Sequence, residues 1–259
     1  PLAEGLLGAM PWQSVFVVFA AIILAALLVL PLLKAPQASR AEIEESMGRI
    51  LGRALRDPSY TLIFLGFFSC GYQLGFITAH FPAFIAEVCS PIPPGSLLAS
   101  LGISSLSALG ALAIAVIGLA NIAGTIAAGA LGSRYRKKYL LAQIYLGRTV
   151  VSAAFILAPM TPASVLVFSV LMGALWLATV PLTSGLIAQI YGPRYMGTLY
   201  GFVFLSHQIG SFMGVWLGGA LYDAYGAYDL VWWIGVGVGL FSAVIQLPIR
   251  ERPAMLRAA

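Results

Sequence analysis

Long apolar runs separated by short polar loops dominate this chain. Seven runs stand out, at 12–33, 58–86, 104–132, 139–158, 163–191, 196–222 and 230–249. A bilayer core of about 30 Å requires roughly 20 helical residues. Strands of a membrane barrel would instead alternate apolar and polar residues in segments of about ten. The pattern therefore predicts an all-α membrane protein with about seven transmembrane helices, plus a separate short helix between Ser96 and Leu106.

Composition and charge favour the same class and give it an orientation. Only 9% of the 259 residues are charged, whereas a soluble domain carries about 25%. Thirteen of the fourteen Lys and Arg residues lie in the link after the first run, in the loop after the third, or after the fifth and seventh. Because basic loops stay in the cytoplasm, we expect the carboxyl terminus to be cytoplasmic.

The chain begins with Pro1 rather than Met, so we expect a segment to precede it. The first run lacks a basic leader and is too long for a cleavable signal peptide. The charged link at 34–57 repeats apolar residues at helical spacing, which predicts an amphipathic helix on the membrane interface; a solvated linker is the alternative. Its apolar residues are Ile43, Met47, Ile50, Leu51 and Leu55.

The loop between the third and fourth runs reads Gly129-Ala-Leu-Gly-Ser133-Arg134-Tyr-Arg-Lys137-Lys138. It resembles the signature loop of the major facilitator superfamily, Gly-x-Leu-Ala/Gly-Asp-Arg-x-Gly-Arg-Arg/Lys. Ser133 replaces the acidic residue and an arginine replaces the second glycine, which is typical of the degenerate copy after the eighth span. The resemblance implies that the seven runs correspond to the sixth to twelfth spans of that fold.

On this interpretation the chain is the carboxyl-terminal six-helix half of a transporter plus one preceding helix. Residues 1–33 are an outer segment and the last span of a missing amino-terminal half, and 34–57 are the cytoplasmic inter-domain link. Residues 58–249 are the transporter domain, and 250–259 are a cytoplasmic tail. The expected partners are the lipid bilayer and the missing half of the same transporter.

Two further segments resemble bacterial relatives of the monocarboxylate transporters. They are Gly66–Gly71 followed by His80-Phe-Pro82, and Thr198–Gln208. The resemblance implies a secondary active transporter of the bacterial inner membrane. It would move a small organic anion by alternating access, either by symport with a proton or by facilitated movement. The third run lacks the arginine that animal relatives and oxalate carriers place in the eighth span.

Polar side chains in hydrocarbon are costly unless they are paired or face a water-filled cavity. Each is therefore a candidate for substrate binding, with pairing to a neighbouring helix as the alternative. Glycines and Pro82 near Gln73 and His80 predict a bent helix there, and transporters bind substrate at broken helices. His207 is the candidate for proton coupling, because histidine titrates near pH 6.5. The cavity-lining candidates are Gln73, His80, Asn121, Thr125, Trp176, Thr179, Thr183, His207, Gln208 and Ser211. Of these, Trp176, Thr179 and Thr183 share one face of the fifth run.

Arg148 is the one cation inside a run. At the bilayer centre an arginine costs about 2.5–3.5 kcal/mol. It lies about 15 Å along a helix from Lys138, so we expect its stem to reach towards the cytoplasm. The expected partner is a backbone carbonyl or a carboxylate, and anion binding is the alternative role.

Small residues form two faces that allow close helix approach. Gly210, Gly214 and Gly218 repeat in the sixth run, and Gly118, Asn121, Thr125, Gly129 and Gly132 repeat in the third. They predict static packing, movement against the missing half, or both. Cys70 and Cys89 are expected to be free thiols, because nineteen helical residues hold them roughly 28 Å apart.

Other functional classes leave no signature. The chain has no His-Glu-x-x-His, Gly-x-Ser-x-Gly or phosphate-loop motif, and no carboxylate pair lies inside a run. We therefore expect no enzyme activity, no cofactor, no metal and no nucleic-acid partner. All three lysines lie in loops, which excludes a retinal Schiff base within a span. A ligand-activated seven-helix receptor and a non-transporting or truncated membrane fragment remain as alternatives.

Overall fold

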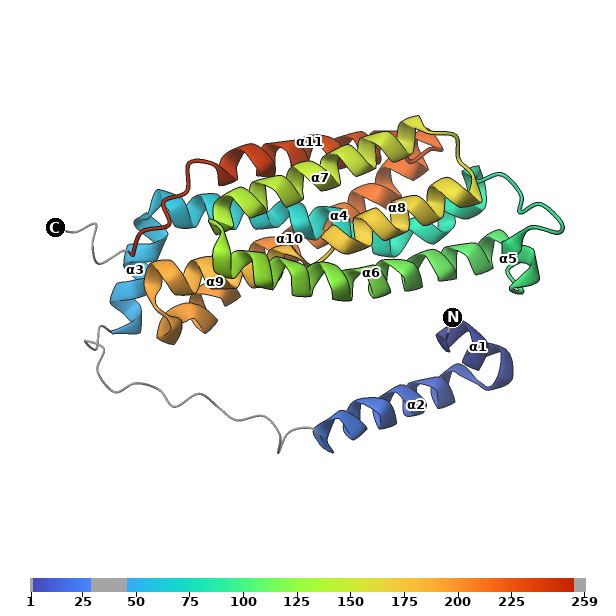
Figure 1. Cartoon of the computed structure of the whole chain (residues 1–259), viewed down its shortest axis with the longest axis horizontal. Coiled ribbons are helices and arrows are strands. Elements are labelled where there is room, and N and C mark those ends of the chain that lie inside the picture. Colours follow the sequence, from blue (N-terminus) through green and yellow to red (C-terminus); the bar gives the residue numbers. More distant parts are fainter. Residues whose placement is uncertain (1, 29–45, 254–259) are drawn as a thin grey trace. The chain divides into compact units, whose positions relative to one another are not determined.

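The computed structural model describes residues 2–28 and 46–253, which fall into two separate units (Figure 1). The first unit contains α1 (Leu2–Ala9) and α2 (Trp12–Ala25). The second contains α3 (Met47–Arg56), α4 (Pro58–Val88), α5 (Leu97–Ser100), α6 (Leu106–Arg134), α7 (Lys137–Leu157), α8 (Pro162–Leu175), α9 (Thr179–Tyr191), α10 (Pro193–Tyr225) and α11 (Asp229–Gln246). No strand occurs among these described residues, so the predicted all-α class is confirmed.

Five described stretches are long and apolar enough to cross a bilayer: Pro58–Val88, Leu106–Arg134, Lys137–Leu157, Pro162–Tyr191 and Asp229–Gln246. α10 has 33 residues, about 50 Å of helix, but its polar residues lower its hydropathy. In the first run, residues 29–33 lie outside the described residues, and Trp12–Leu28 is a shorter apolar helix. The count of seven spans therefore stays a prediction.

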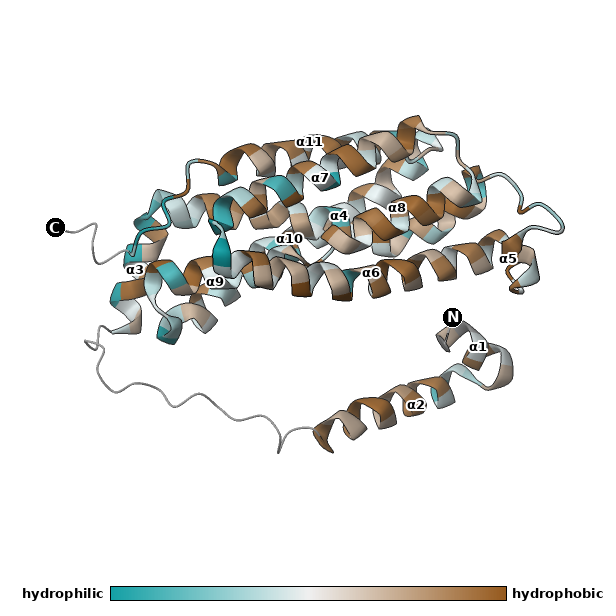
Figure 2. Ribbon diagram, viewed as in Figure 1, coloured by the Kyte–Doolittle hydropathy of each residue, from teal (hydrophilic) through white to brown (hydrophobic). Residues whose placement is uncertain are grey.

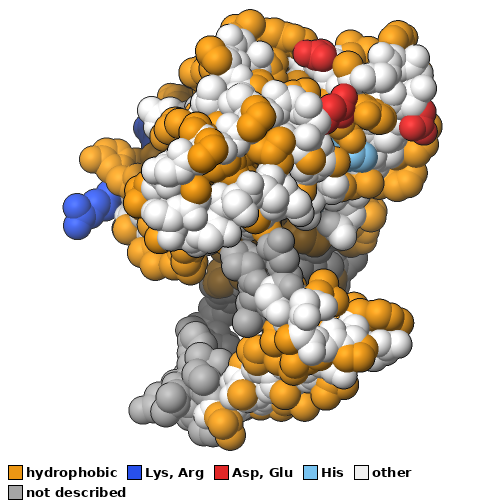
Figure 3. Space-filling view, turned by 90° about the vertical axis from the view of Figure 1, so that its right-hand side faces the viewer, with side chains coloured by type: hydrophobic (Ala, Val, Ile, Leu, Met, Phe, Trp, Pro, Cys, Tyr) orange, Lys and Arg blue, Asp and Glu red, His pale blue; other side chains and the backbone are white. Residues whose placement is uncertain are grey.

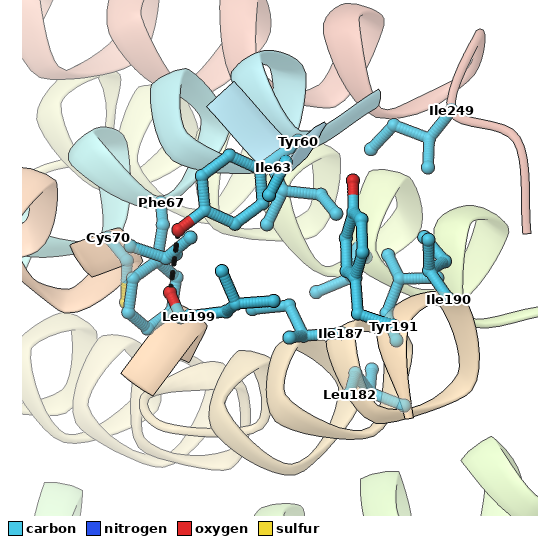
Figure 4. Close-up of a cluster of buried hydrophobic side chains, with 14 of the residues drawn as sticks. Tyr60, Ile63, Phe67, Cys70, Leu182, Ile187, Ile190, Tyr191, Leu199 and Ile249 are labelled. Atoms are coloured by element: carbon cyan, nitrogen blue, oxygen red, sulfur yellow. Dashed lines mark hydrogen bonds between the residues drawn. The ribbon is translucent and has the colours of Figure 1, made fainter. Parts of the chain in front are cut away.

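α4 is the central helix of the second unit. It packs most extensively against α10 and also contacts α11 and α6, while α7 packs on α11 and α8 on α6 (Figure 1). One core cluster surrounds Tyr60, whose hydroxyl donates a hydrogen bond to the Leu199 carbonyl at 2.8 Å (Figure 4). A second core cluster is rich in aromatic residues and includes Phe155 stacked on Phe168, with 4.3 Å between the ring centroids. Cys70 belongs to the first cluster and Tyr72 to the second, so the two meet within α4.

Glycines let the backbones of α4 and α10 touch. A Cβ atom on Gly71 would overlap the His207 carbonyl oxygen, and one on Gly214 would overlap the Tyr72 carbonyl oxygen. The packing interpretation of the Gly210–Gly218 face is therefore confirmed. Movement of this face against a missing half is wrong, because α4 already occupies it. On α6, by contrast, a Cβ atom added to Gly118 or Gly129 would meet no described atom outside its own helix backbone within 4 Å.

Two expectations about short helices are refined. α3 confirms a helix in the charged link, and it buries Ile50 and Ala54; Ile43 lies outside the described residues. Between Ser96 and Leu106 the separate helix exists, but α5 has only four residues. α4 runs without a break from Pro58 to Val88, with Pro82 inside it.

Polar residues concentrate at the ends of the helices in the second unit. Figure 2 shows hydrophilic positions around α3, α9 and the start of α7, with apolar residues along the helices between the ends. Figure 3 views the opposite end, where acidic side chains lie among apolar ones. Basic residues from the α6–α7 loop and from the segment after α11 line one open cavity of about 730 Å³, together with Gln189 and Glu251.

The glycine contact gives the first testable prediction. Gly214→Ala places a methyl group against the Tyr72 carbonyl, and overpacking of this kind costs about 1–3 kcal/mol. We expect a lower thermal unfolding midpoint for the purified protein in detergent. Gly219→Ala is the matched control, because no described atom lies within 4 Å of its new Cβ and alanine favours a helix by about 1 kcal/mol over glycine. Equal midpoints for the two variants would contradict the contact.

Candidate functional site

The predicted continuous helix over 163–191 is broken in the structure. α8 ends at Leu175 and α9 begins at Thr179. Pro181, the third residue of α9, has no N–H, and its ring excludes a helical carbonyl four residues earlier, at Leu177. Trp176 therefore stands in the break, and the expectation that it shares one helical face with Thr179 and Thr183 is wrong.

A side chain from α6 satisfies the backbone at the break. The Leu177 N–H donates to Oδ1 of Asn121 at 3.0 Å, and Thr125 Oγ1 donates to the same oxygen at 3.1 Å. Interrupted backbone at membrane depth persists only where such groups are satisfied or line a cavity. Asn121 and Thr125, both half-buried, thus stabilise the interruption between α8 and α9.

Arg148 is placed differently from the sequence-based expectation. Its side chain is fully buried, at 0% exposure, and Nη1 donates to Sγ of Cys70 at 3.3 Å. Cys70 Sγ also lies in a hydrogen bond with Thr179 Oγ1 at 3.4 Å. The arginine is buried inside the bundle rather than reaching its end, and its hydrogen-bond partner among the described residues is neither a carbonyl nor a carboxylate. α4 supplies a thiol instead, through Cys70.

Further polar groups surround this pair. Among the described residues, no hydrogen-bond partner is found for Arg148 Nε and Nη2 or for the buried hydroxyls of Tyr145 and Tyr200. The backbone carbonyl of His207 lies against Gly71, the residue after Cys70, and its ring stacks on that of Phe204, with 5.0 Å between the ring centroids. We call these groups the Cys70–Arg148 cluster: Cys70 from α4, Tyr145 and Arg148 from α7, Thr179 from α9, and Tyr200 and His207 from α10.

With this geometry established, the chain can be compared with known proteins. The model of the Major Facilitator Superfamily matches residues 1–214 and 88–258. The chain belongs to this superfamily. It is also 26% identical over 248 residues to "Uncharacterized MFS-type transporter YcxA" of Bacillus subtilis (strain 168), which covers 91% of this chain and 56% of the relative. The chain thus spans about half the length of the curated relative that it matches.

Membership of the superfamily, together with the apolar helices, makes the chain part of an integral membrane protein. It also points to transport rather than catalysis. The segment that resembles the superfamily signature loop runs from the end of α6 into the start of α7, and it carries Gly129, Ser133, Arg134, Lys137 and Lys138. Ser133 Oγ donates within its own helix to the Ala130 carbonyl at 2.7 Å, where the family consensus has a carboxylate.

This signature-like segment is hydrogen-bonded to the segment after α11. Lys138 Nζ donates to the Leu247 carbonyl at 2.7 Å, and the Lys138 backbone N–H donates to a carboxylate oxygen of Glu251. Gln189 at the end of α9 donates to the Glu251 carbonyl at 3.0 Å and accepts from Lys137 Nζ at 3.0 Å. These hydrogen bonds join the start of α7, the end of α9 and the segment after α11 at one end of the bundle.

The structure gathers only some of the predicted site residues. Thr179 and His207 join the Cys70–Arg148 cluster, and Gln208 Oε1 lies 3.3 Å from Nδ1 of His207. Thr183 is buried on α9, and Ser211 is half-buried on α10.

The other two predicted residues on α4 lie apart from the cluster. Gln73 donates to the Gly235 carbonyl in α11 at 3.0 Å. His80 Nε2 lies 2.9 Å from the Val215 carbonyl in α10. Both have structural partners, as the alternative interpretation allowed.

Sequence reasoning did not place Cys70, Tyr145 or Tyr200 in the site. Both cysteines are free thiols, as predicted, but Cys70 is also the hydrogen-bond partner of Arg148. One signal was available: Tyr145 and Arg148 are three residues apart and so share a face of α7. That face needed a polar partner, which the sequence alone does not identify.

The broken helix gives the second prediction. Asn121→Ala removes the acceptor for the Leu177 N–H, and an unsatisfied buried donor costs about 1–3 kcal/mol. We expect hydrogen exchange of peptides covering residues 175–180 to accelerate by about tenfold or more. Thr125→Val is the control, because it leaves the Asn121 oxygen in place. Unchanged exchange in Asn121→Ala would show that this contact does not hold the break.

Proposed function

We propose that this chain is the carboxyl-terminal half of a secondary transporter, spans six to twelve. The complete protein moves a small, monocarboxylate-like organic anion across the bacterial inner membrane by alternating access, together with a proton. The carboxyl terminus lies in the cytoplasm. Superfamily membership and the transporter relative support the class of activity, and the one-sided distribution of Lys and Arg supports the orientation.

The Cys70–Arg148 cluster is the observation on which the anion proposal depends. Three of the nine acidic residues lie outside the described residues, and each described acidic residue of the second unit lies in a loop or near a helix end. Arg148 is therefore a cation deep in an apolar bundle with no carboxylate at its depth. In a low-dielectric medium such a charge attracts anions strongly. Animal relatives and oxalate carriers have an arginine in the span that corresponds to α6, where this chain has none. Arg148 in α7 supplies the positive charge instead.

The broken helix beside the cluster supports a binding role. Discontinuous helices near the middle of the membrane form the substrate sites of many transporters. Here the break at Trp176–Ala178 directly precedes Thr179, which hydrogen-bonds Cys70. His207 retains 8% exposure at the edge of the cluster. It is the group through which a proton reaches the buried residues.

The energetics of this transport follow from charge balance. A monoanion that moves with one proton carries no net charge, so the membrane potential does not drive it. One unit of pH gradient supplies about 1.4 kcal/mol, which supports roughly tenfold accumulation. The transporter would therefore depend on the pH gradient alone.

The third prediction concerns His207. In the complete protein, His207→Ala removes the imidazole that connects the cluster to its surroundings. We expect proton-driven uptake of a radiolabelled monocarboxylate panel into proteoliposomes to be lost, with membrane expression and monodispersity unchanged. The control is the wild-type protein: if it accumulates a panel member under an imposed pH gradient, that member is used to assay the variant. Wild-type uptake by the variant would refute the proton role of His207.

The fourth prediction concerns the missing half. The superfamily cavity lies between two six-helix halves, so this chain alone should transport nothing in liposomes. Co-expression with a complementary amino-terminal half should restore uptake. Robust flux through this chain alone would contradict the proposed division. If co-expression with the amino-terminal half gave no flux, the alternative of a non-transporting membrane protein would be favoured.

A further inference from the structure

The charge of Arg148 has no carboxylate to balance it within the bundle. The acidic residues nearest along α4 are Asp57, at its N-cap, and Glu87, near its last turn. They lie 13 and 17 residues from Cys70, or about 20 Å and about 26 Å along the helix. The Arg148 side chain itself has 0% exposure.

An unbalanced buried charge costs several kcal/mol, and arginine does not lose its proton in proteins. Neutrality must therefore come from a partner. Among the described residues, the hydrogen bond of the guanidinium is to Sγ of Cys70, at 3.3 Å. A thiol beside an arginine or a protonated histidine ionises more readily than a free one. Cys70 also lies in a hydrogen bond with the Thr179 hydroxyl, which is able to donate to a thiolate.

The groups around Cys70 from each neighbouring helix are consistent with an anion at Sγ. α7 contributes Arg148, which donates to Sγ, and Tyr145, which lies in the same core cluster as Cys70. α10 contributes His207, whose carbonyl lies against Gly71, and Tyr200, which packs against that cluster. The charged residues of α6 and α11, Arg134 and Asp229, stand at the ends of those helices. α3 ends fourteen residues before Cys70, about 21 Å away along the chain direction of α4. No described carboxylate competes for Arg148.

We propose that Cys70 is the counter-ion of Arg148, as a thiolate when the transporter is empty, and that it takes up a proton when the substrate anion enters. A proton from the aqueous phase first binds the neutral imidazole of His207. The N–H bond of this imidazolium then breaks, the S–H bond of Cys70 forms, and His207 is neutral again. The positive charge of Arg148 is then balanced by the substrate anion. When the anion leaves, the proton returns through His207, and the thiolate pairs with the arginine again.

This exchange of counter-ions couples one proton to one monoanion. The cluster is electrically neutral both when it is empty and when it is loaded, so neither state carries a large desolvation cost through the membrane. The role in transport rests on the proposed function. The charge state of the empty cluster does not, and it can be measured without any substrate.

Infrared spectroscopy of the complete protein in lipid vesicles tests the charge state, because the S–H stretching band of a thiol disappears on ionisation. The wild-type spectrum minus that of Cys70→Ser isolates Cys70, whatever other thiols are present. The wild-type spectrum minus that of Cys89→Ser isolates the matched control. Cys89 lies at the end of α4, where burial raises the pKa of its thiol, so it stays protonated.

We expect the Cys70 difference spectrum to lack the S–H band at neutral pH and to gain it on acidification. The Cys89 band should be present throughout. In Arg148→Gln the Cys70 band should appear at neutral pH, because the charge that favours the thiolate is gone. A Cys70 band in the wild-type protein at neutral pH overturns the proposal, and this readout does not require the Arg148 variant to fold. If Cys70 is a thiolate but the complete protein takes up no organic anion, the transport role is refuted, whereas the ion pair between Cys70 and Arg148 is still supported.

Discussion

Backbone contact between α4 and α10 positions the other parts of the site. Glycines on both helices remove the side chains that would separate them, and the carbonyl of His207 lies against Gly71, the residue after Cys70. Close approach of this kind is the main source of helix association in membranes, where apolar burial gives no net driving force between helices. It places the imidazole of α10 and the thiol of α4 at one depth. α7 then contacts the thiol through Arg148.

The spans were predictable from the sequence because apolarity and length are properties of single segments. α4, α6, α7, α10 and α11 begin and end within a few residues of the predicted runs. The break in the fifth run was not predicted, although Pro181 was visible in it. A proline three residues into a helix is well tolerated, so its position alone does not distinguish a new helix from a kink. The structure decides because Asn121, 56 residues away, satisfies the freed backbone group.

The candidate site was less predictable for a related reason. Thr179 and His207 are polar residues in apolar surroundings, and that signal is local. The partner of Arg148 is 78 residues away in the sequence, and cysteine is as common in apolar cores as a small hydrophobic residue. Nothing in the sequence around Cys70 separates a packing role from an ionic one. Only the arrangement of the helices brings the guanidinium to the sulfur.

The single oxygen of Asn121 accepts from both Thr125 on its own helix and Leu177 in the break. α6 is thereby linked mechanically to the hinge between α8 and α9. A tilt of α6 would pull on the backbone two residues before Thr179, and through that hydroxyl on the thiol it contacts. The face of α6 carrying Gly118 and Gly129 has open space beside it. A helix that packs there and tilts α6 would shift the backbone at Leu177. Through Thr179 and Cys70, that shift would reach the buried Arg148.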